Sequence, residues 1–259
     1  IGIIGVTSIN SLETATGAHV ESISEITMSS ISSDINTVRF DTQSLSREPE
    51  IINAVEESNQ EFEQLEDINE TMRKREEYWT TGNASFRREM LERPVSKLLQ
   101  EEVSLKTELF NRSRKNEMLV TNRYGALVAA SGNVTDYIQS DETWWQRVRN
   151  GTGFVGELRR DRSLGTYTVE FSQPIYDSEG EFIGLITNGI PIESMIQPVV
   201  NQISDTQVGG FIHFTVVDED GNIYYDSRTE TPQYDQNIEN LIRRLEESEE
   251  PYIKTESFE

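Results

Sequence analysis

Seven residues in the middle of the chain have the side chains that a pocket for a small polar ligand needs. Aromatic residues come first and would form an apolar wall, as is usual in such pockets. Two arginines and an aspartate follow, and a guanidinium can form two hydrogen bonds to a carboxylate while an aspartate can pair with an amine. We predict a ligand-binding set made of Tyr137, Trp144, Trp145, Arg159, Arg160, Asp161 and Tyr167.

The two adjacent tryptophans lie in a segment, 142–149, that is expected to be a short helix. Neighbouring residues of a helix point in different directions, so Trp144 and Trp145 cannot both face one pocket. We therefore expect at least one of them to be a core residue that holds this helix on a sheet.

A glycine motif follows this helix and resembles a dinucleotide-binding fingerprint. Gly151, Gly153 and Gly156 fit the spacing G-x-G-x-x-G. The fingerprint binds pyrophosphate only when a strand precedes it and a helix follows it. Here the helical segment 142–149 comes before the glycines and an expected strand at 154–158 comes after them. The motif is therefore interpreted as a loop.

Metal sites and catalytic centres have little support in the sequence. The segment 218–222, DEDGN, begins like a calcium-binding EF-hand loop, but Ile223 and Thr229 occupy the positions that require glycine and glutamate. His19 and His213 are the only histidines, and there is no cysteine. This excludes histidine-rich and thiolate metal sites, and no G-x-S-x-G motif is present. We expect no metal, no cofactor and no enzyme activity; a secreted hydrolase with a carboxylate pair is a weaker alternative.

The charge of the chain limits its partners. Aspartate and glutamate number 46 against 23 lysines and arginines, for a net charge of −23. Such a surface would repel nucleic acid and anionic membranes. Acidity combined with few lysines favours a halophilic protein over an ordinary acidic one. No apolar run reaches the length of about 20 residues that a membrane helix needs. The opening IGIIGV is either the end of a preceding membrane helix or the first turn of a soluble helix.

The period of the apolar residues changes along the chain. Helical spacing over 11–45 predicts a long amphipathic helix, and a second helix is expected from Pro49 to Trp79. A third is expected over 85–109, divided by Pro94. Near Met118 the pattern becomes extended. We therefore expect an α+β fold with a helical region at 1–110, a PAS-like antiparallel-sheet module at 111–191, a connecting helix and hinge at 192–210, and a small or truncated second module at 211–259.

Three turns share one pattern, an Asn or Asp followed three residues later by glycine, which suits a hairpin. They are Asn122–Gly125, Asp177–Gly180 and Asp218–Gly221. The first and third lie in similar runs, MLVTNRYGALVAAS and FTVVDEDGNIYYDS, which are interpreted as the opening hairpins of two related modules. After the second hairpin we expect a helix at 235–247 and a strand at 252–258.

The order of these pieces resembles the double Cache sensor domains of chemoreceptors and sensor histidine kinases. The resemblance covers residues 11–227 and is strongest in VTNRYGALVAASGNVTDYIQSDETWWQRV and TYTVEFSQPIYDSEGEFIGLI. It implies an extracellular domain of a membrane receptor, flanked by membrane helices outside this chain. It also implies that a membrane-distal module binds ligand and that the long N-terminal helix pairs in a homodimer.

The chain departs from the pattern of the amino-acid-binding members of this family. Where they have an arginine, a tyrosine and an aspartate, this sequence has Glu142, Arg159 and Gly189; only Trp144 and Asp161 match. The resemblance therefore implies a small organic acid or another anion in preference to an amino acid. We predict a ligand-sensing domain of a halophilic, archaeal signal transducer. The alternative is an interaction domain that binds a ligand-loaded binding protein.

Overall fold

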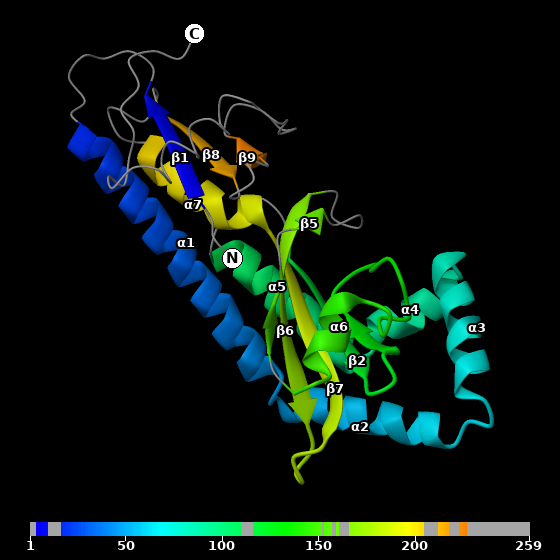
Figure 1. Ribbon diagram of the computed structural model, residues 1–259. Helices are drawn as coiled ribbons and strands as arrows, with labels where there is room; N and C mark the ends of the chain where they lie inside the picture. The colour runs from blue at the N-terminus through cyan, green and yellow to red at the C-terminus, as the bar shows by residue number, and fades with distance from the viewer. Residues whose placement is uncertain are drawn as a thin grey trace. The chain divides into compact units, whose positions relative to one another are not determined.

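A computed structural model gives the fold (Figure 1) and describes residues 4–9, 17–109, 116–151, 153–156, 159–160, 166–204, 212–217 and 223–226. It combines helices with antiparallel sheets, so the predicted α+β fold is confirmed. The chain divides into two compact units, 35–194 and 1–34 with 195–259. This differs from the expected consecutive regions, because the first strand of the chain pairs with a strand beyond residue 211.

Among the described residues, five helices precede the central sheet: α1 (Gly17–Leu45), α2 (Pro49–Glu63), α3 (Ile68–Thr80), α4 (Ala84–Glu92) and α5 (Pro94–Leu109). The prediction of one helix from Pro49 to Trp79 was wrong, since α2 ends before Asp67 and α3 begins after it. The Asp67 carboxylate caps α3 by accepting a hydrogen bond from the Glu70 amide at 2.9 Å. Pro94 opens α5, as proline can where the first helical amide needs no partner.

The sheet of unit 35–194 contains β2 (Glu117–Asn122), β3 (Leu127–Ala130), β4 (Phe154–Val155), β5 (Arg159–Arg160), β6 (Tyr167–Tyr176) and β7 (Phe182–Pro191). Its order is β3-β2-β7-β6-β4, with β5 also paired to β6, and all pairs are antiparallel. The long hairpin of β6 and β7 forms its centre. The helix α6 (Thr143–Val148) lies between β3 and β4 in the chain.

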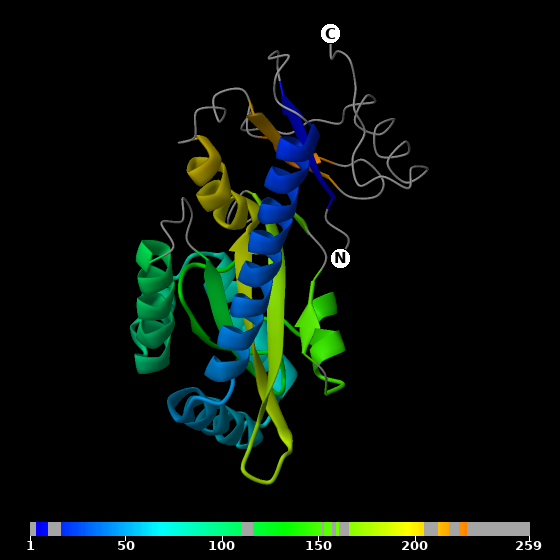
Figure 2. The same cartoon turned by 90° about the vertical axis from the view of Figure 1, so that its left-hand side faces the viewer.

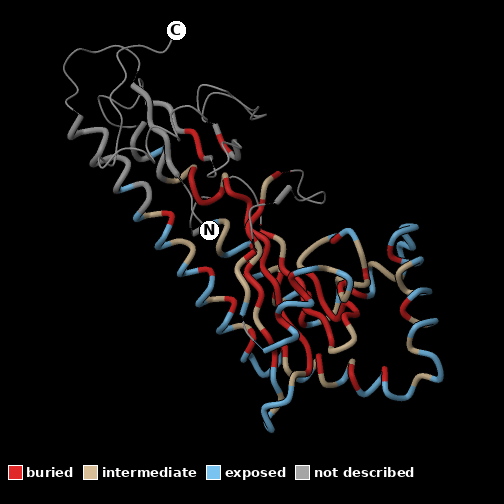
Figure 3. Tube along the Cα trace, viewed as in Figure 1, coloured by how far each residue is buried: buried red, intermediate tan, exposed pale blue. Residues whose placement is uncertain are grey.

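Helices cover both faces of this sheet, so each face carries its own hydrophobic core (Figures 2 and 3). Alternate residues of a strand point to opposite faces. Val120 packs with Val55 of α2 and Leu99 of α5 on one face. Leu119 belongs to the core on the other face, which includes residues of α3, α4 and α6. The strands are therefore buried on both sides.

The two predicted hairpin turns of this unit are present. Asn122–Gly125 joins β2 to β3, and Asp177–Gly180 joins β6 to β7. Both glycines adopt a positive φ, 81° at Gly125 and 85° at Gly180, which glycine reaches without strain. The Asp177 carboxylate accepts hydrogen bonds from the amides of Glu179 and Glu181 and so closes its turn.

The other unit contains a three-stranded sheet in the order β1 (Ile4–Ile9), β8 (Ile212–Val217), β9 (Ile223–Asp226). The expectation of a helix at the start of the chain was wrong, because residues 4–9 pair as a strand with β8. The hairpins β2–β3 and β8–β9 each have one extra residue, Val128 and Tyr224, in the second strand. This shared β-bulge agrees with the similarity of the two sequence runs.

The predicted connecting helix is α7 (Ile192–Ser204), with Pro198 inside it. The expected hinge at 209–210, the turn 218–221, the helix at 235–247 and the strand at 252–258 lie outside the described residues. No helix in the described part of the chain is both long and apolar enough to cross a membrane.

Candidate functional site

The helix α6 places both tryptophans against the central sheet. Trp144 and Trp145 are only 5% and 2% exposed, and both belong to the core on this face of the sheet. The Trp145 indole nitrogen donates a hydrogen bond to the Thr121 hydroxyl of β2 at 3.0 Å. The expectation that at least one tryptophan is a core residue is confirmed and extends to both. Their contact with a ligand stays a prediction.

The end of α6 adds cations to this aromatic layer. The Arg149 guanidinium lies 5.6 Å from the centre of the Trp145 ring, and Arg147 lies 5.0 Å from that of Phe154 on β4. Both are cation–π distances. Gly151 and Gly153 lie between α6 and β4, Gly156 follows β4, and Gly151 has a φ of 99°. The loop interpretation of the glycine motif is therefore confirmed, since a helix precedes it and a strand follows it.

Polar residues form part of the sheet surface that α6 covers. Thr121 of β2 points to this face, as its bond to Trp145 shows. The strand register places Thr187 of β7 on the same face, and Ser172 of β6 is directly opposite Thr187. The hydroxyls of Ser172 and Thr187 are 2.7 Å apart, and both residues are buried. These hydroxyls are therefore polar groups, bonded to each other, within a sheet face that is otherwise mostly apolar.

A second polar row lies beside these hydroxyls. Glu117 of β2, Gly189 of β7 and Glu170 of β6 are directly opposite one another in the register. The sequence analysis missed this row and the hydroxyl pair. A signal was available, because Thr168, Glu170 and Ser172 alternate with apolar residues and so mark one polar face of β6.

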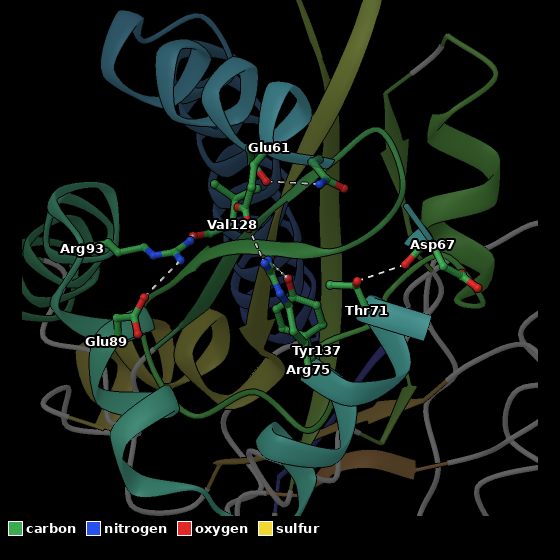
Figure 4. Close-up of polar contacts among 10 residues, drawn as sticks. Glu61, Asp67, Thr71, Arg75, Glu89, Arg93, Val128 and Tyr137 are labelled. Carbon is green, nitrogen blue, oxygen red and sulfur yellow. Dashed lines mark hydrogen bonds and ion pairs between the residues drawn. The ribbon is translucent and has the colours of Figure 1, made fainter. Parts of the chain in front are cut away.

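Tyr137 lies in the segment between β3 and α6 and bonds to α3 instead of to β6 (Figure 4). The Arg75 guanidinium donates a hydrogen bond to the Tyr137 hydroxyl at 3.2 Å and forms an ion pair with Glu61. Burial raises the pKa of the Tyr137 hydroxyl, and the positive charge of Arg75 opposes part of this shift. Tyr137 is 1% exposed and shares the core of the two tryptophans.

Three of the remaining predicted residues, Arg159, Arg160 and Tyr167, lie at the start of β6 or on the short strand paired with it. Arg159 pairs with Thr168 and Arg160 with Tyr167, so the short strand β5 borders the same strand that carries Ser172. Tyr167 is partly buried. Asp161 lies outside the described residues. The structure thus brings Arg159, Arg160 and Tyr167 together through backbone pairing.

A hollow of about 460 Å³ lies elsewhere in unit 35–194 and contains none of the predicted residues. The Arg93 guanidinium on its wall donates a hydrogen bond at 3.2 Å to the carbonyl of Val128, the bulge residue of β3. The hollow is lined by Glu50, Asn53, Ala54, Glu57, Ser58, Glu61, Arg93, Pro94, Val95 and Val128. Within the described part of the chain, no group of three or more histidine, cysteine, aspartate or glutamate residues could hold a metal ion.

No protein-family model matches the chain, and no curated protein matches its sequence. Among solved structures, the sensor domain of the V. cholerae histidine kinase DctB is 12% identical with a TM-score of 0.49. The match covers 81% of this chain and 66% of that domain. The ligand-binding domain of the Pseudomonas aeruginosa amino acid chemoreceptor PctC, in complex with GABA, is 14% identical with a TM-score of 0.46, over 87% and 79% of the two chains.

A third similar structure is the ligand-binding domain of the Campylobacter jejuni chemoreceptor Tlp3 in complex with L-norvaline. It is 17% identical with a TM-score of 0.40, over 81% of this chain and 78% of that one. All three are sensor or ligand-binding domains of kinases or chemoreceptors. At these identities and scores, the similarity assigns no ligand or site residue to this chain.

Proposed function

We propose that this chain is the ligand-sensing domain of a membrane signal transducer, a chemoreceptor or a histidine kinase, and that it catalyses no reaction itself. One observation carries the proposal: the aromatic helix α6 covers a sheet face with buried hydroxyls at Ser172 and Thr187. A mostly apolar enclosure with a few polar groups is the usual design of a small-molecule site. The resemblance of this region to Cache sensor domains supports the same assignment.

The ligand is a small polar molecule with an anionic group. Arg159 and Arg160 carry this part of the proposal, because their strand pairs with the start of β6, beside the polar face. Arginine is well suited to bind a carboxylate through two parallel hydrogen bonds. An organic acid is therefore the first compound class to test.

The domain faces the outside of the cell and is anchored by membrane helices beyond the present chain. Its acidity, with a net charge of −23, supports a halophilic source. We also propose a homodimer that forms through α1. Two apolar side chains of this helix are mostly exposed, Ile26 at 55% and Phe40 at 70%, and a partner helix would bury them.

Thermal unfolding in the presence of single compounds tests the sensing function. A ligand that binds only the folded state raises the melting temperature. We expect at least one organic acid, amine or amino acid, GABA and L-norvaline included, to do so, and R159Q to weaken the effect. R88Q, at an exposed arginine of α4, is the matched control and should leave it unchanged. If no compound shifts the melting temperature, the alternative of a docking domain for a ligand-loaded binding protein gains support.

Molar mass in solution tests the proposed dimer. Light scattering after size-exclusion chromatography should give about 59 kDa for two copies of the 29.6 kDa chain. F40E should shift the mass toward that of one chain, because a charge would be buried at the interface. Q60E, which adds the same charge at an exposed position of α2 outside the proposed interface, is the control. A single-chain mass at all accessible concentrations would refute the dimer.

A further inference from the structure

Five asparagines of the chain begin a triplet Asn-x-Ser or Asn-x-Thr whose middle residue is not proline. They are Asn69, Asn83, Asn111, Asn133 and Asn150. This triplet is the acceptor sequence for N-linked sugars on exported proteins. Triplets of this kind also arise by chance, so the local structure decides which of them can accept a sugar in the folded protein. Asn111 lies outside the described residues.

Transfer of a sugar requires two free groups on one accessible stretch of backbone. The carboxamide nitrogen of the asparagine forms the bond to the sugar, and the hydroxyl two residues later must reach the same carboxamide. In a helix, residues two apart do not face each other. A triplet that is helical, or whose groups already bond within the protein, is therefore a poor acceptor after folding.

Two of the triplets do not meet this requirement. Asn69 lies in the first turn of α3, and the hydroxyl of Thr71 in the same triplet donates a hydrogen bond to the Asp67 carbonyl at 3.0 Å. Asn83 is the N-cap of α4, and its carboxamide oxygen accepts a hydrogen bond from the Phe86 amide at 3.1 Å. Both asparagines are exposed, so it is their bonding and helical geometry that make them poor acceptors.

The triplet at Asn133 does meet the requirement. It lies between β3 and α6, where the chain forms neither helix nor strand. Asn133 and Thr135 are both exposed. The Asn133 carboxamide forms no hydrogen bond within the described part of the chain. The Thr135 hydroxyl bonds at the surface to the neighbouring Asp136 carboxylate at 2.9 Å, a contact that water can replace.

The triplet at Asn150 follows the last turn of α6. Asn150 is exposed and lies in the turn between α6 and β4. Gly151, the middle residue of the triplet, has a φ of 99°, so the backbone leaves the helical conformation there. The Asn150 carboxamide has no hydrogen-bond partner among the residues that the structure describes. Thr152, the third residue, lies outside those residues.

We propose that Asn133 and Asn150 of the folded domain carry N-linked sugars and that Asn69 and Asn83 do not. The donor is an oligosaccharide bound to a lipid phosphate. The asparagine nitrogen forms a bond to the first carbon of the sugar, the bond from that carbon to the phosphate oxygen breaks, and the lipid phosphate takes up one amide proton. This inference rests on the proposed function, because such a transfer takes place on chains that face the outside of the cell.

The two acceptor sites flank α6 in the chain (Figure 1). Val134, next to Asn133, and Val148, near Asn150, belong to the core on the sheet face that α6 covers. Leu45, at the end of α1, packs against the core on the opposite face. Because sugars are bulky and hydrated, they would keep the outer surface around α6 in water. They would leave the end of α1 free for the proposed dimer.

Peptide mass spectrometry of the protein purified from the cells that naturally produce it tests this inference. We expect the peptides with Asn133 and Asn150 to carry the added mass of a sugar. The peptides with Asn69 and Asn83 should have their unmodified masses. Sugar at Asn69 or Asn83 in the same proportion as at Asn133 would overturn the inference, because the folded geometry would then not select the acceptors. An unmodified mass at Asn133 or at Asn150 would overturn it as well.

Sequence variants made in the same cells test the triplet at Asn133. N133Q removes the acceptor nitrogen and T135A removes the hydroxyl, so each should abolish the sugar at position 133. T135S retains a hydroxyl and should retain the sugar. N53Q, at an exposed asparagine outside any triplet, is the matched control and should leave every sugar in place. Unchanged melting temperatures would show that the exposed substitutions leave the domain folded; a sugar that persists in T135A would contradict the proposed acceptor.

Labelling of intact cells separates this inference from the proposed function. An amine-reactive biotin that cannot cross membranes should modify Lys97, which is exposed on α5. If Lys97 reacts and neither Asn133 nor Asn150 carries a sugar, the inference is wrong while the extracellular position stands. If Lys97 reacts only after the cells are broken, the proposed position outside the cell fails, and the inference fails with it.

Discussion

The indole nitrogen of Trp145 is 3.0 Å from the hydroxyl oxygen of Thr121, and the hydrogen bond between them joins α6 to β2 across the core. Thr121 is fully buried and Trp145 is 2% exposed, so water cannot replace either partner. Together with the packing of Trp144, Trp145 and Val148, this polar contact holds the helix over the polar face of the sheet. It therefore connects the stability of the unit with the geometry of the proposed site.

Removal of the Thr121 hydroxyl should destabilise the protein. T121V keeps the size of the side chain but leaves the buried indole N–H without an acceptor, which costs about 1–3 kcal/mol. Urea denaturation measures the free energy of unfolding. T135V, which removes a hydroxyl at an exposed position, serves as the control and should change it by less than about 0.5 kcal/mol. Equal effects of the two substitutions would contradict the prediction.

Glu76 of α3 should be important for the segment that carries Tyr137. One of its carboxylate oxygens accepts hydrogen bonds from the amides of Tyr137 and Ile138 at 2.9 and 2.8 Å. E76A leaves both amides without this partner and should lower the free energy of unfolding by roughly 2–4 kcal/mol. E77A, at the exposed neighbouring position, should have little effect. The prediction fails if hydrogen exchange at residues 137 and 138 is no faster in E76A.

Three glycines should respond differently to alanine. At Gly125 the φ of 81° disfavours a side chain, and a Cβ would lie 2.7 Å from the Ser140 nitrogen. G125A should therefore cost more than about 2 kcal/mol. Gly180 has a φ of 85° but open space around it, so G180A should cost about 1 kcal/mol. G132A, at a position with neither constraint, should be neutral or slightly stabilising. Thermal or urea denaturation of the three variants measures these costs. A different ranking of the three destabilisation energies would contradict the prediction.

The buried hydroxyl of Tyr137 should make stability depend on pH in alkaline solution. Burial raises its pKa in the folded state, so the unfolded chain loses this proton first, near pH 10. The protonated Tyr137 hydroxyl therefore makes its full contribution to the free energy of unfolding below that pH. This contribution is lost as the pH rises toward the pKa of the folded state. The stability difference between the wild type and Y137F should therefore be constant from pH 7 to 9 and decrease above pH 10. Urea denaturation of both proteins across this pH range measures the stability difference. A difference that stays constant to pH 11 would contradict the raised pKa of Tyr137.

Local sequence patterns were sufficient for much of the fold. The turn at Asn122–Gly125 and the helix break at Pro94 were predicted correctly, because turn and proline chemistry act on adjacent residues. The break between α2 and α3 was missed, since it contains neither glycine nor proline and depends on a single N-cap at Asp67. The strand at residues 4–9 was also missed, because a short apolar run does not reveal whether its partner is solvent, membrane or a distant strand.

The sequence by itself determined the residue types near the site, the aromatic helix segment and the turns that flank it. It placed Trp144 and Trp145 on a helix against a sheet, which local periodicity can show. Only the tertiary structure decided which residues lie beneath that helix. Glu117, Gly189 and Glu170 are far apart in sequence, and the pairing of β2, β7 and β6 brings them into one row. Strand register depends on packing over the whole sheet, and a shift of one residue would turn each of these side chains to the opposite face.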